Sequence, residues 1–179
     1  KCGMLAKAEQ VLKQLPIRVV ASWNALISVY SQHGQGDEAL KCFEWMQQEG
    51  LAPDETTFVC LLRACASTGA INKGEKIYDD IVSRGLLEKN VLVGTALVDM
   101  YAKCGALAKA QQALEELPMR DVVSWNALIG GYAQQGRGHR AMDCFTRMRN
   151  EGLSPNAVTF LCVISACNYS GRLDDAQTY

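Results

Sequence analysis

The sequence predicts an all-α fold, an α-solenoid of stacked antiparallel helix pairs. The first observation is an internal repeat, because Trp23-Asn24-Ala25-Leu26-Ile27 recurs as Trp125-Asn126-Ala127-Leu128-Ile129, and position 125 lies 102 residues after position 23. The second observation is the spacing of apolar residues three and four apart, which places them on one face of a helix. The third is that glycines stand singly between these stretches, as breaks between short helices.

The first full repeat covers residues 20–54. Its first helix is predicted by an apolar stripe at Trp23, Leu26, Ile27 and Tyr30, and the segment Gly34-Gln35-Gly36 predicts the turn. The stripe of the second helix consists of Ala39, Cys42, Phe43 and Met46. A single pair of this size cannot bury its own stripe, so successive pairs must stack.

Two related repeats complete the cycle. Residues 55–90 carry a first stripe, a turn at Thr68-Gly69 and a second stripe, formed by Phe58, Leu61, Leu62, Cys65, Ile71, Ile77 and Ile81. Residues 91–121 carry the stripe Val93, Leu97, Met100 and Tyr101, a turn at Cys104-Gly105 and a second helix closed by Pro118. The cycle restarts with residues 122–156.

The two ends of the sequence hold incomplete repeats. Residues 1–19 are the end of a short repeat, and residues 157–179 begin a new one. Because Lys1-Cys2-Gly3 matches Lys103-Cys104-Gly105, we expect the chain to begin inside a repeat.

Composition narrows the possible functions. The net charge of −1 and the isoelectric point near 6.2 provide no basic field that would attract polyanions from a distance. The eight cysteines include no Cys-x-x-Cys and fall mostly on apolar helix faces, so we expect reduced core residues in place of disulfides or a metal site. We expect no metal, no cofactor and no membrane span.

The motif of residues 122–156 resembles the pentatricopeptide repeat. The resemblance rests on Val122-Val123-Ser124-Trp125-Asn126-Ala127-Leu128-Ile129, Tyr132, Gly136, Ala141, Phe145, Met148 and Gly152-Leu153-Ser154-Pro155-Asn156. The Leu-Gly pair of the tetratricopeptide repeat is missing at the corresponding spacing. The resemblance implies a right-handed superhelix whose first helices line a concave face that binds single-stranded RNA, one base per repeat.

The alternation of repeat lengths is similar to the plant P-L-S subclass. On this resemblance the chain contains the C-terminal part of an S-type repeat (1–19), a P-type repeat (20–54), an L-type repeat (55–90), an S-type repeat (91–121), a second P-type repeat (122–156) and a partial L-type repeat (157–179).

Pairs of polar residues are the candidate base-reading groups. Asn24 follows the core residue Trp23 by about 100° around the helix, and the residue that ends each repeat lies next to the following first helix. By resemblance to the family's code, Asn24 with Asp54 prefers uracil, Thr95 with Asp121 prefers guanine, and Asn126 with Asn156 prefers cytosine or uracil. Val59 with Asn90 is a weaker pair without an assigned base, so the expected site is 5′-U-N-G-C/U-3′.

Each candidate has a competing structural role. Asp54, Asp121 and Asn156 directly precede predicted helices, where a side-chain oxygen caps free N–H groups whatever the function. The family also holds each base between the second residues of successive repeats, here Ala21, Thr56, Leu92, Val123 and Val158, although small or aliphatic residues there also suit helix packing. Lys103 is a candidate phosphate contact that equally fits a solvated lysine. Val19 occupies the place that Asp121 has one cycle later, so the repeat 1–19 lacks an end residue of this kind.

The sequence contains no catalytic constellation. His33 and His139 stand near turns without a matching nucleophile or carboxylate, and neither His-x-Glu nor Cys-x-x-Cys of a zinc deaminase occurs. The resemblance implies the recognition array of a C-to-U RNA-editing factor of mitochondria or chloroplasts, with small partner proteins docking on residues 55–90 and the deaminase domain supplied elsewhere. The alternative is a protein-binding solenoid scaffold without an RNA role.

Overall fold

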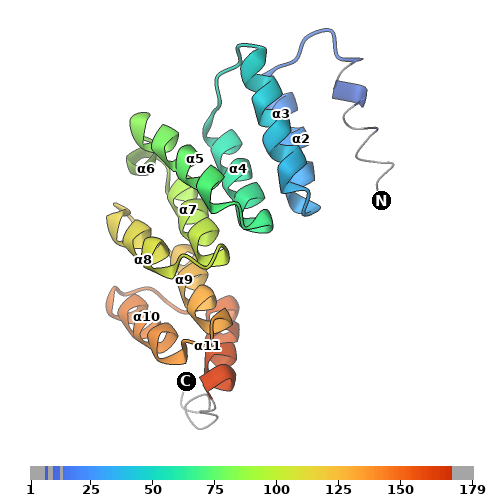
Figure 1. The fold of residues 1–179 in the computed structure, drawn as a ribbon. Helices are drawn as coiled ribbons and strands as arrows, with labels where there is room; N and C mark the ends of the chain where they lie inside the picture. The colour runs from blue at the N-terminus through green and yellow to red at the C-terminus, as the bar shows by residue number, and fades with distance from the viewer. Residues whose placement is uncertain (1–6, 8–9, 13, 171–179) are drawn as a thin grey trace. The chain divides into compact units, whose positions relative to one another are not determined.

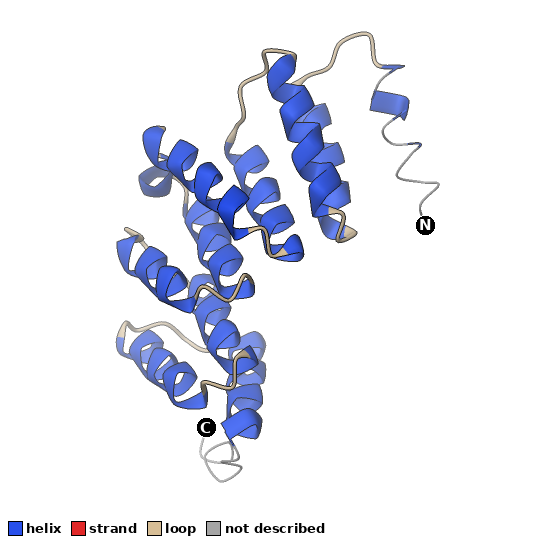
Figure 2. Ribbon diagram, in the orientation of Figure 1, coloured by secondary structure: helices blue, strands red, loops and turns tan. Residues whose placement is uncertain are grey.

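The computed structural model describes residues 7, 10–12 and 14–170 (Figure 1). The predictions for Lys1-Cys2-Gly3 and for residues 171–179 lie outside this part of the chain. All regular secondary structure in the described residues is helical, as predicted (Figure 2). The chain divides into two compact parts, Lys1–Leu86 and Leu87–Tyr179.

The N-terminal part contains two helix pairs. Helices α2 (Val20–Gln32) and α3 (Gly36–Gln48) lie in the first full repeat, and α4 (Glu55–Thr68) and α5 (Ile71–Ser83) lie in the second. Helix α4 packs against α2, α3 and α5, so the two pairs share one core. Gly36 makes this contact possible, because a Cβ there would lie 2.4 Å from the Ala64 carbonyl oxygen of α4.

The C-terminal part contains two further pairs and one more helix. These are α7 (Val91–Lys103) with α8 (Leu107–Glu116), α9 (Val122–Gln134) with α10 (Gly138–Asn150), and α11 (Ala157–Ser170). Helix α9 packs against α7 on one side and α11 on the other, so the first helices of successive repeats follow one another within this part (Figure 1). Gly131 of α9 allows this approach, because a Cβ there would lie 2.9 Å from Ala102 Cβ and from Leu107 Cδ2.

The predicted apolar stripes form most of the core. Trp23, Phe58 and Trp125 are buried, together with the other stripe residues of their first helices. Phe43 and Ile71 of the second helices are half-buried, at the edge of the core. The helix α6 (Leu86–Lys89) was not predicted, because a single turn is too short to show a helical period.

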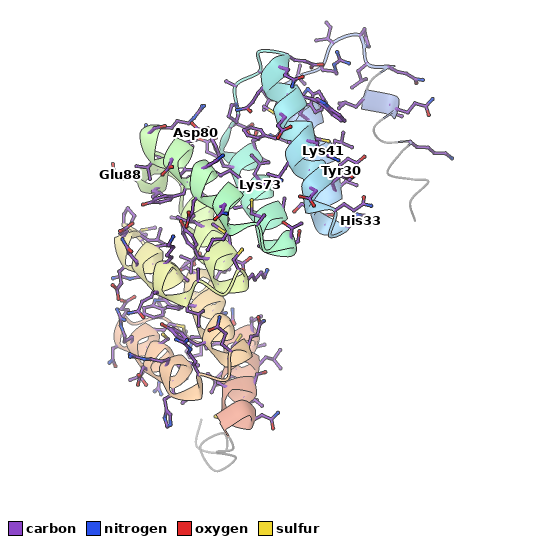
Figure 3. All side chains as sticks on the ribbon, viewed as in Figure 1. Tyr30, His33, Lys41, Lys73, Asp80 and Glu88 are labelled. Carbon is purple, nitrogen blue, oxygen red and sulfur yellow. The ribbon has the colours of Figure 1, made fainter. Side chains whose placement is uncertain are left out.

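The predicted turns lie at glycines with positive φ. Gly34, Gly69 and Gly105 have φ of 71°, 67° and 80°, a conformation that glycine adopts without steric cost. At the first of these turns His33 follows α2, and its Nδ1 lies 2.8 Å from the Val29 carbonyl oxygen (Figure 3).

The repeats 20–54 and 122–156 share a network that holds the end of their second helix. The indole Nε1 of Trp23 donates to Glu49 at 3.1 Å, and Arg18 forms an ion pair with the same carboxylate at 2.7 Å. One cycle later Trp125 donates to Glu151 at 3.0 Å, and Arg120 pairs with it at 3.1 Å. The second helices are also linked by ion pairs, such as that of Lys73 on α5 (labelled in Figure 3) with Asp37 on α3 at 3.3 Å.

None of the described cysteines forms a disulfide, and most are buried as expected. Burial raises the pKa of the Cys144 thiol to about 11, so this group stays protonated and inert at neutral pH. Within the described residues no group of three or more His, Cys, Asp or Glu side chains is arranged to hold a metal ion. No helix in that part has the length and apolar character that a bilayer crossing requires.

Candidate functional site

The structure brings together the two residues of each assigned pair. Asn24 on α2 donates from Nδ2 to Asp54 Oδ1 at 2.8 Å, and Asn126 on α9 donates from Nδ2 to Asn156 Oδ1 at 3.1 Å. The Thr95 hydroxyl on α7 lies 3.5 Å from Asp121 Oδ1, a longer and weaker contact. An inner side chain therefore faces the residue that ends its repeat at three places along the chain.

The two members of each pair differ in exposure. We call Asn24, Thr95 and Asn126 the inner residues; only 6–8% of each is exposed. We call Asp54, Asp121 and Asn156 the outer residues. Asp54 and Asn156 are exposed and Asp121 is half-buried. A ligand would therefore meet the outer residue first, with the inner residue behind it.

The outer residues also cap the following helices. Asp54 Oδ1 accepts from the Thr57 N–H at 2.8 Å, and Asp121 Oδ1 accepts from the Ser124 N–H at 2.7 Å. Asn156 Oδ1 accepts from the Thr159 N–H at 3.0 Å. Capping and pairing therefore occur together at every outer residue.

The cap determines which group an asparagine can offer to a ligand. A cap requires an acceptor, so the oxygen of the Asn156 amide is committed to the helix N-terminus and its NH₂ group remains as a donor. An ionised aspartate has only acceptors, whichever oxygen caps the helix. Asp54 and Asp121 therefore present acceptors, and Asn156 presents donors.

Hydrogen bonds keep Asp54 ionised. Partial burial acts to raise the pKa of its carboxyl, but hydrogen bonds, chiefly from the Thr57 N–H and the Asn24 amide, outweigh burial and hold the pKa below its usual range. The carboxylate is therefore an obligate acceptor at neutral pH.

The weaker pair has a different character. Asn90 caps α7, because its Oδ1 accepts from the N–H of Leu92 at 2.9 Å and of Val93 at 3.4 Å. Val59 is half-buried on α4 and has no polar side-chain atom. The repeat 55–90 thus has an outer residue without a polar inner residue.

The candidate sandwiching residues are on the surface. Leu92, Val123 and Val158 are 52–68% exposed, and Ala21 and Thr56 are exposed as well. Packing into the core therefore does not explain the aliphatic side chains of Leu92, Val123 and Val158. These three lie on first turns whose helices are capped by Asn90, Asp121 and Asn156.

The candidate phosphate contact already has a partner. Lys103 Nζ lies 2.8 Å from Asp99 Oδ2, one turn earlier on α7. Both side chains reach solvent, where such a pair contributes little and exchanges readily. A phosphate contact of Lys103 stays a prediction.

Sequence reasoning missed the hydroxyl residue three positions after each outer residue. Thr57, Ser124 and Thr159 are fully buried, and each hydroxyl accepts from the backbone N–H of its outer residue at 3.1 Å. Together with the caps these bonds form reciprocal capping boxes. The recurring Ser or Thr at this spacing was the signal that could have identified them.

Comparison with known families identifies the repeat. A family model described as the PPR repeat family matches residues 18–67 and 120–168, and a model described as PPR repeat matches residues 56–86.

Curated relatives share this region. A putative pentatricopeptide repeat-containing protein of Arabidopsis thaliana is 42% identical over 179 residues, which is all of this chain and 22% of that protein. The chloroplastic pentatricopeptide repeat-containing protein DOT4 of the same plant is 38% identical over 180 residues and 21% of its length. The chain therefore spans about a fifth of the length of these relatives.

Solved structures have the same fold. The protein PPR10 in complex with an 18-nt psaJ RNA element matches with a TM-score of 0.84 at 22% identity, over 98% of this chain and 26% of that one. PPR10 from maize matches with a TM-score of 0.78 at 26% identity, over 99% of this chain and 26% of that one. These matches confirm the predicted α-solenoid fold. Because the first family model alone covers more than half of the residues, the chain belongs to the pentatricopeptide (PPR) repeat family.

Proposed function

We propose that this chain binds single-stranded RNA and reads one base per repeat. The proposal rests on an arrangement that occurs three times, in which an inner residue contacts an outer residue that caps the next helix. The paired atoms are 2.8, 3.1 and 3.5 Å apart. The near-neutral charge makes such polar contacts, and not a general basic field, the source of affinity.

The chemistry of the outer residue selects the central atom of the Watson–Crick edge. Uracil and guanine carry an N–H at this place, which an aspartate accepts, whereas cytosine and adenine carry a lone pair that a carboxylate repels. Asp54 and Asp121 therefore favour uracil or guanine. The NH₂ group of Asn156 donates to the lone pair of cytosine N3 or to a carbonyl oxygen of uracil.

The inner residue then selects base size. Asn24 and Asn126 extend far enough to contact their outer residues at short distance, which leaves room for a pyrimidine. Thr95 is shorter and more distant from Asp121, which leaves room for a purine. The proposed site is therefore 5′-U-N-G-C/U-3′, with no base assigned to the repeat 55–90.

The exposed aliphatic residues complete the proposed slots. Thr56, Leu92, Val123 and Val158 lie on first turns that begin with a capping side chain, and Ala21 lies on the first turn of α2, so a base beside an outer residue would contact such exposed side chains on its faces. Stacking of this kind is tolerant of sequence and adds affinity without changing the choice of base.

The family supports an organellar setting for this proposed function. PPR10 binds an RNA element in its solved complex, and relatives of this chain are named chloroplastic or mitochondrial proteins. The P-L-S alternation of lengths supports the role of a recognition array in an organellar C-to-U editing factor. The L-type repeat 55–90, which has no polar inner residue, is then the candidate docking surface for a small partner protein.

The test is fluorescence anisotropy of the chain with short RNAs that contain UNGC or UNAC. We expect the G-containing RNA to bind at least about tenfold more tightly, because Asp121 accepts from guanine N1–H and would face the adenine N1 lone pair. The variant Asp121→Asn keeps the cap and should reverse this preference. Tight binding that is indifferent to this base, or binding of proteins without any RNA affinity, would overturn the proposal in favour of the scaffold.

A further inference from the structure

The two repeats with an asparagine as inner residue hold that asparagine differently. In repeat 20–54 the amide of Asn24 is bonded at both ends, because Nδ2 donates to Asp54 at 2.8 Å and Oδ1 accepts from the Thr57 hydroxyl at 2.6 Å. Thr57 is fully buried, so no water competes for this hydroxyl. Its oxygen also lies 2.9 Å from Asp54 Oδ1, so one residue contacts both members of the pair.

The corresponding amide in repeat 122–156 is bonded at one end only. Asn126 Nδ2 donates to Asn156 at 3.1 Å, but Asn126 Oδ1 is buried without a hydrogen-bond partner among the described residues. The Thr159 hydroxyl, which has the place of Thr57, donates to Asn156 Oδ1 at 3.1 Å instead. A buried acceptor without a partner is unfavourable, and a ligand that supplies a donor would relieve it.

Rotation of the amide costs more in the first repeat than in the second. Turning the Asn24 amide would break two short hydrogen bonds and direct its oxygen at the charged Asp54 carboxylate. Turning the Asn126 amide would break one longer bond and direct its oxygen at the neutral Asn156 amide. The first amide is therefore held more firmly than the second.

We infer that Thr57 is a third, specificity-determining residue of the site in repeat 20–54, which holds the Asn24 amide so that this repeat accepts uracil and rejects cytosine. Because Asn126 lacks the equivalent bond, repeat 122–156 accepts either pyrimidine. Thr57 acts through Asn24 and Asp54, so it is a positioning residue. The inference rests on the proposed function and specifies how strictly each repeat selects its base.

The chain provides a matched control for Thr57. Ser124 has the same position after Asp121 and is also fully buried, but its hydroxyl donates to the Asp121 backbone carbonyl at 2.9 Å and not to a side chain of the pair. Removing the Ser124 hydroxyl therefore weakens a capping box without changing an inner residue. Thr57→Val removes the hydroxyl and keeps the side-chain shape.

The experiment measures selectivity at two positions of one RNA. The chain and its Thr57→Val and Ser124→Ala variants are titrated by NMR with oligomers UNGC, CNGC and UNAC, and melting is followed by circular dichroism. We expect Thr57→Val to lower the preference for U over C by about five- to tenfold, the size of one hydrogen bond, and to leave the preference for G over A unchanged. Ser124→Ala should lower the melting temperature with no change in the preference for U over C.

The outcomes separate the two proposals. If the unsubstituted chain binds these RNAs without base preference, or does not bind them, the proposed function is overturned. If it prefers U and Thr57→Val keeps that preference while folded, the role of Thr57 is overturned and the proposed function stands. A parallel loss at both RNA positions in Thr57→Val would show a general structural role and would also overturn the inference.

Discussion

Repeats 20–54 and 122–156 share a framework of contacts around a buried tryptophan but differ in the hydrogen bonds of their inner and outer residues. Both hold a buried tryptophan whose indole donates to a glutamate, and in both an arginine from the preceding repeat binds that glutamate. The outer residue is Asp54 in the first and Asn156 in the second, and the inner amide is bonded at both ends only in the first. The framework is thus kept while the groups that would meet a base vary.

The largest expected effect concerns the tryptophans of this shared framework. Trp125→Ala should lower the free energy of unfolding by about 3–5 kcal/mol, since it removes a fully buried indole. Trp23→Ala should cause a loss of similar size, because Trp23 is only 4% exposed and its indole makes the same bond to a glutamate. Urea unfolding followed by circular dichroism measures both. A clearly smaller loss from one variant would show that the two frameworks are not equivalent.

The second effect concerns the close approach of the first helices at Gly131. The corresponding position in repeat 20–54 is Val29. Gly131→Ala should destabilise the C-terminal part by about 1–3 kcal/mol, because the added Cβ would overlap Ala102 and Leu107. The control is Gly130→Ala, where a Cβ meets only Cys162 Sγ at 3.3 Å and the gain in helix propensity offsets the contact. Equal unfolding midpoints for the two variants would contradict a tight contact at Gly131.

A third effect concerns the helix caps. Helix α9 is capped by Asp121, whereas α2 begins after Val19, which has no capping side chain and is exposed. Asp121→Ala should cost about 1 kcal/mol, and Val19→Asp should stabilise the chain by a similar amount. Thermal melts of the two variants should move in opposite directions. A destabilising Val19→Asp would mean that Val19 has packing that its exposure does not show.

The smallest effect is a pH dependence confined to repeat 20–54. Because hydrogen bonds lower the pKa of Asp54, its contribution to stability is present above the pKa of an unfolded aspartate and is lost as the pH falls through the folded value. Asn156, the outer residue of repeat 122–156, carries an amide that does not ionise, so it contributes no such pH dependence. NMR titration of the Asp54 carboxyl should give a midpoint below the ordinary aspartate value, and Asn24→Ala should move that midpoint upward. An unshifted midpoint in the unsubstituted chain would contradict the bonds to Asp54.

The helices and turns could be predicted because a period and a glycine are local signals. The pairing of Asn24 with Asp54 could also be predicted, because the repeat length places the end of one pair beside the start of the next. The different bonding of the two inner amides could not, since Asn24 and Asn126 are the same residue type, as are Thr57 and Thr159. The atom that each hydroxyl contacts depends on the exact positions of the neighbouring helices. Residue types alone do not reveal these positions.

The capping boxes have a consequence for exchanging segments between such chains. Each outer residue is held by the first turn of the next repeat, so the recognition groups run over residues 24–57, 95–124 and 126–159, out of phase with the folding repeats by about one helical turn. A graft cut at a folding boundary would separate an outer residue from the hydroxyl that orients it. A graft cut at Phe58 or Trp125 would transfer the base preference together with everything that holds it in place.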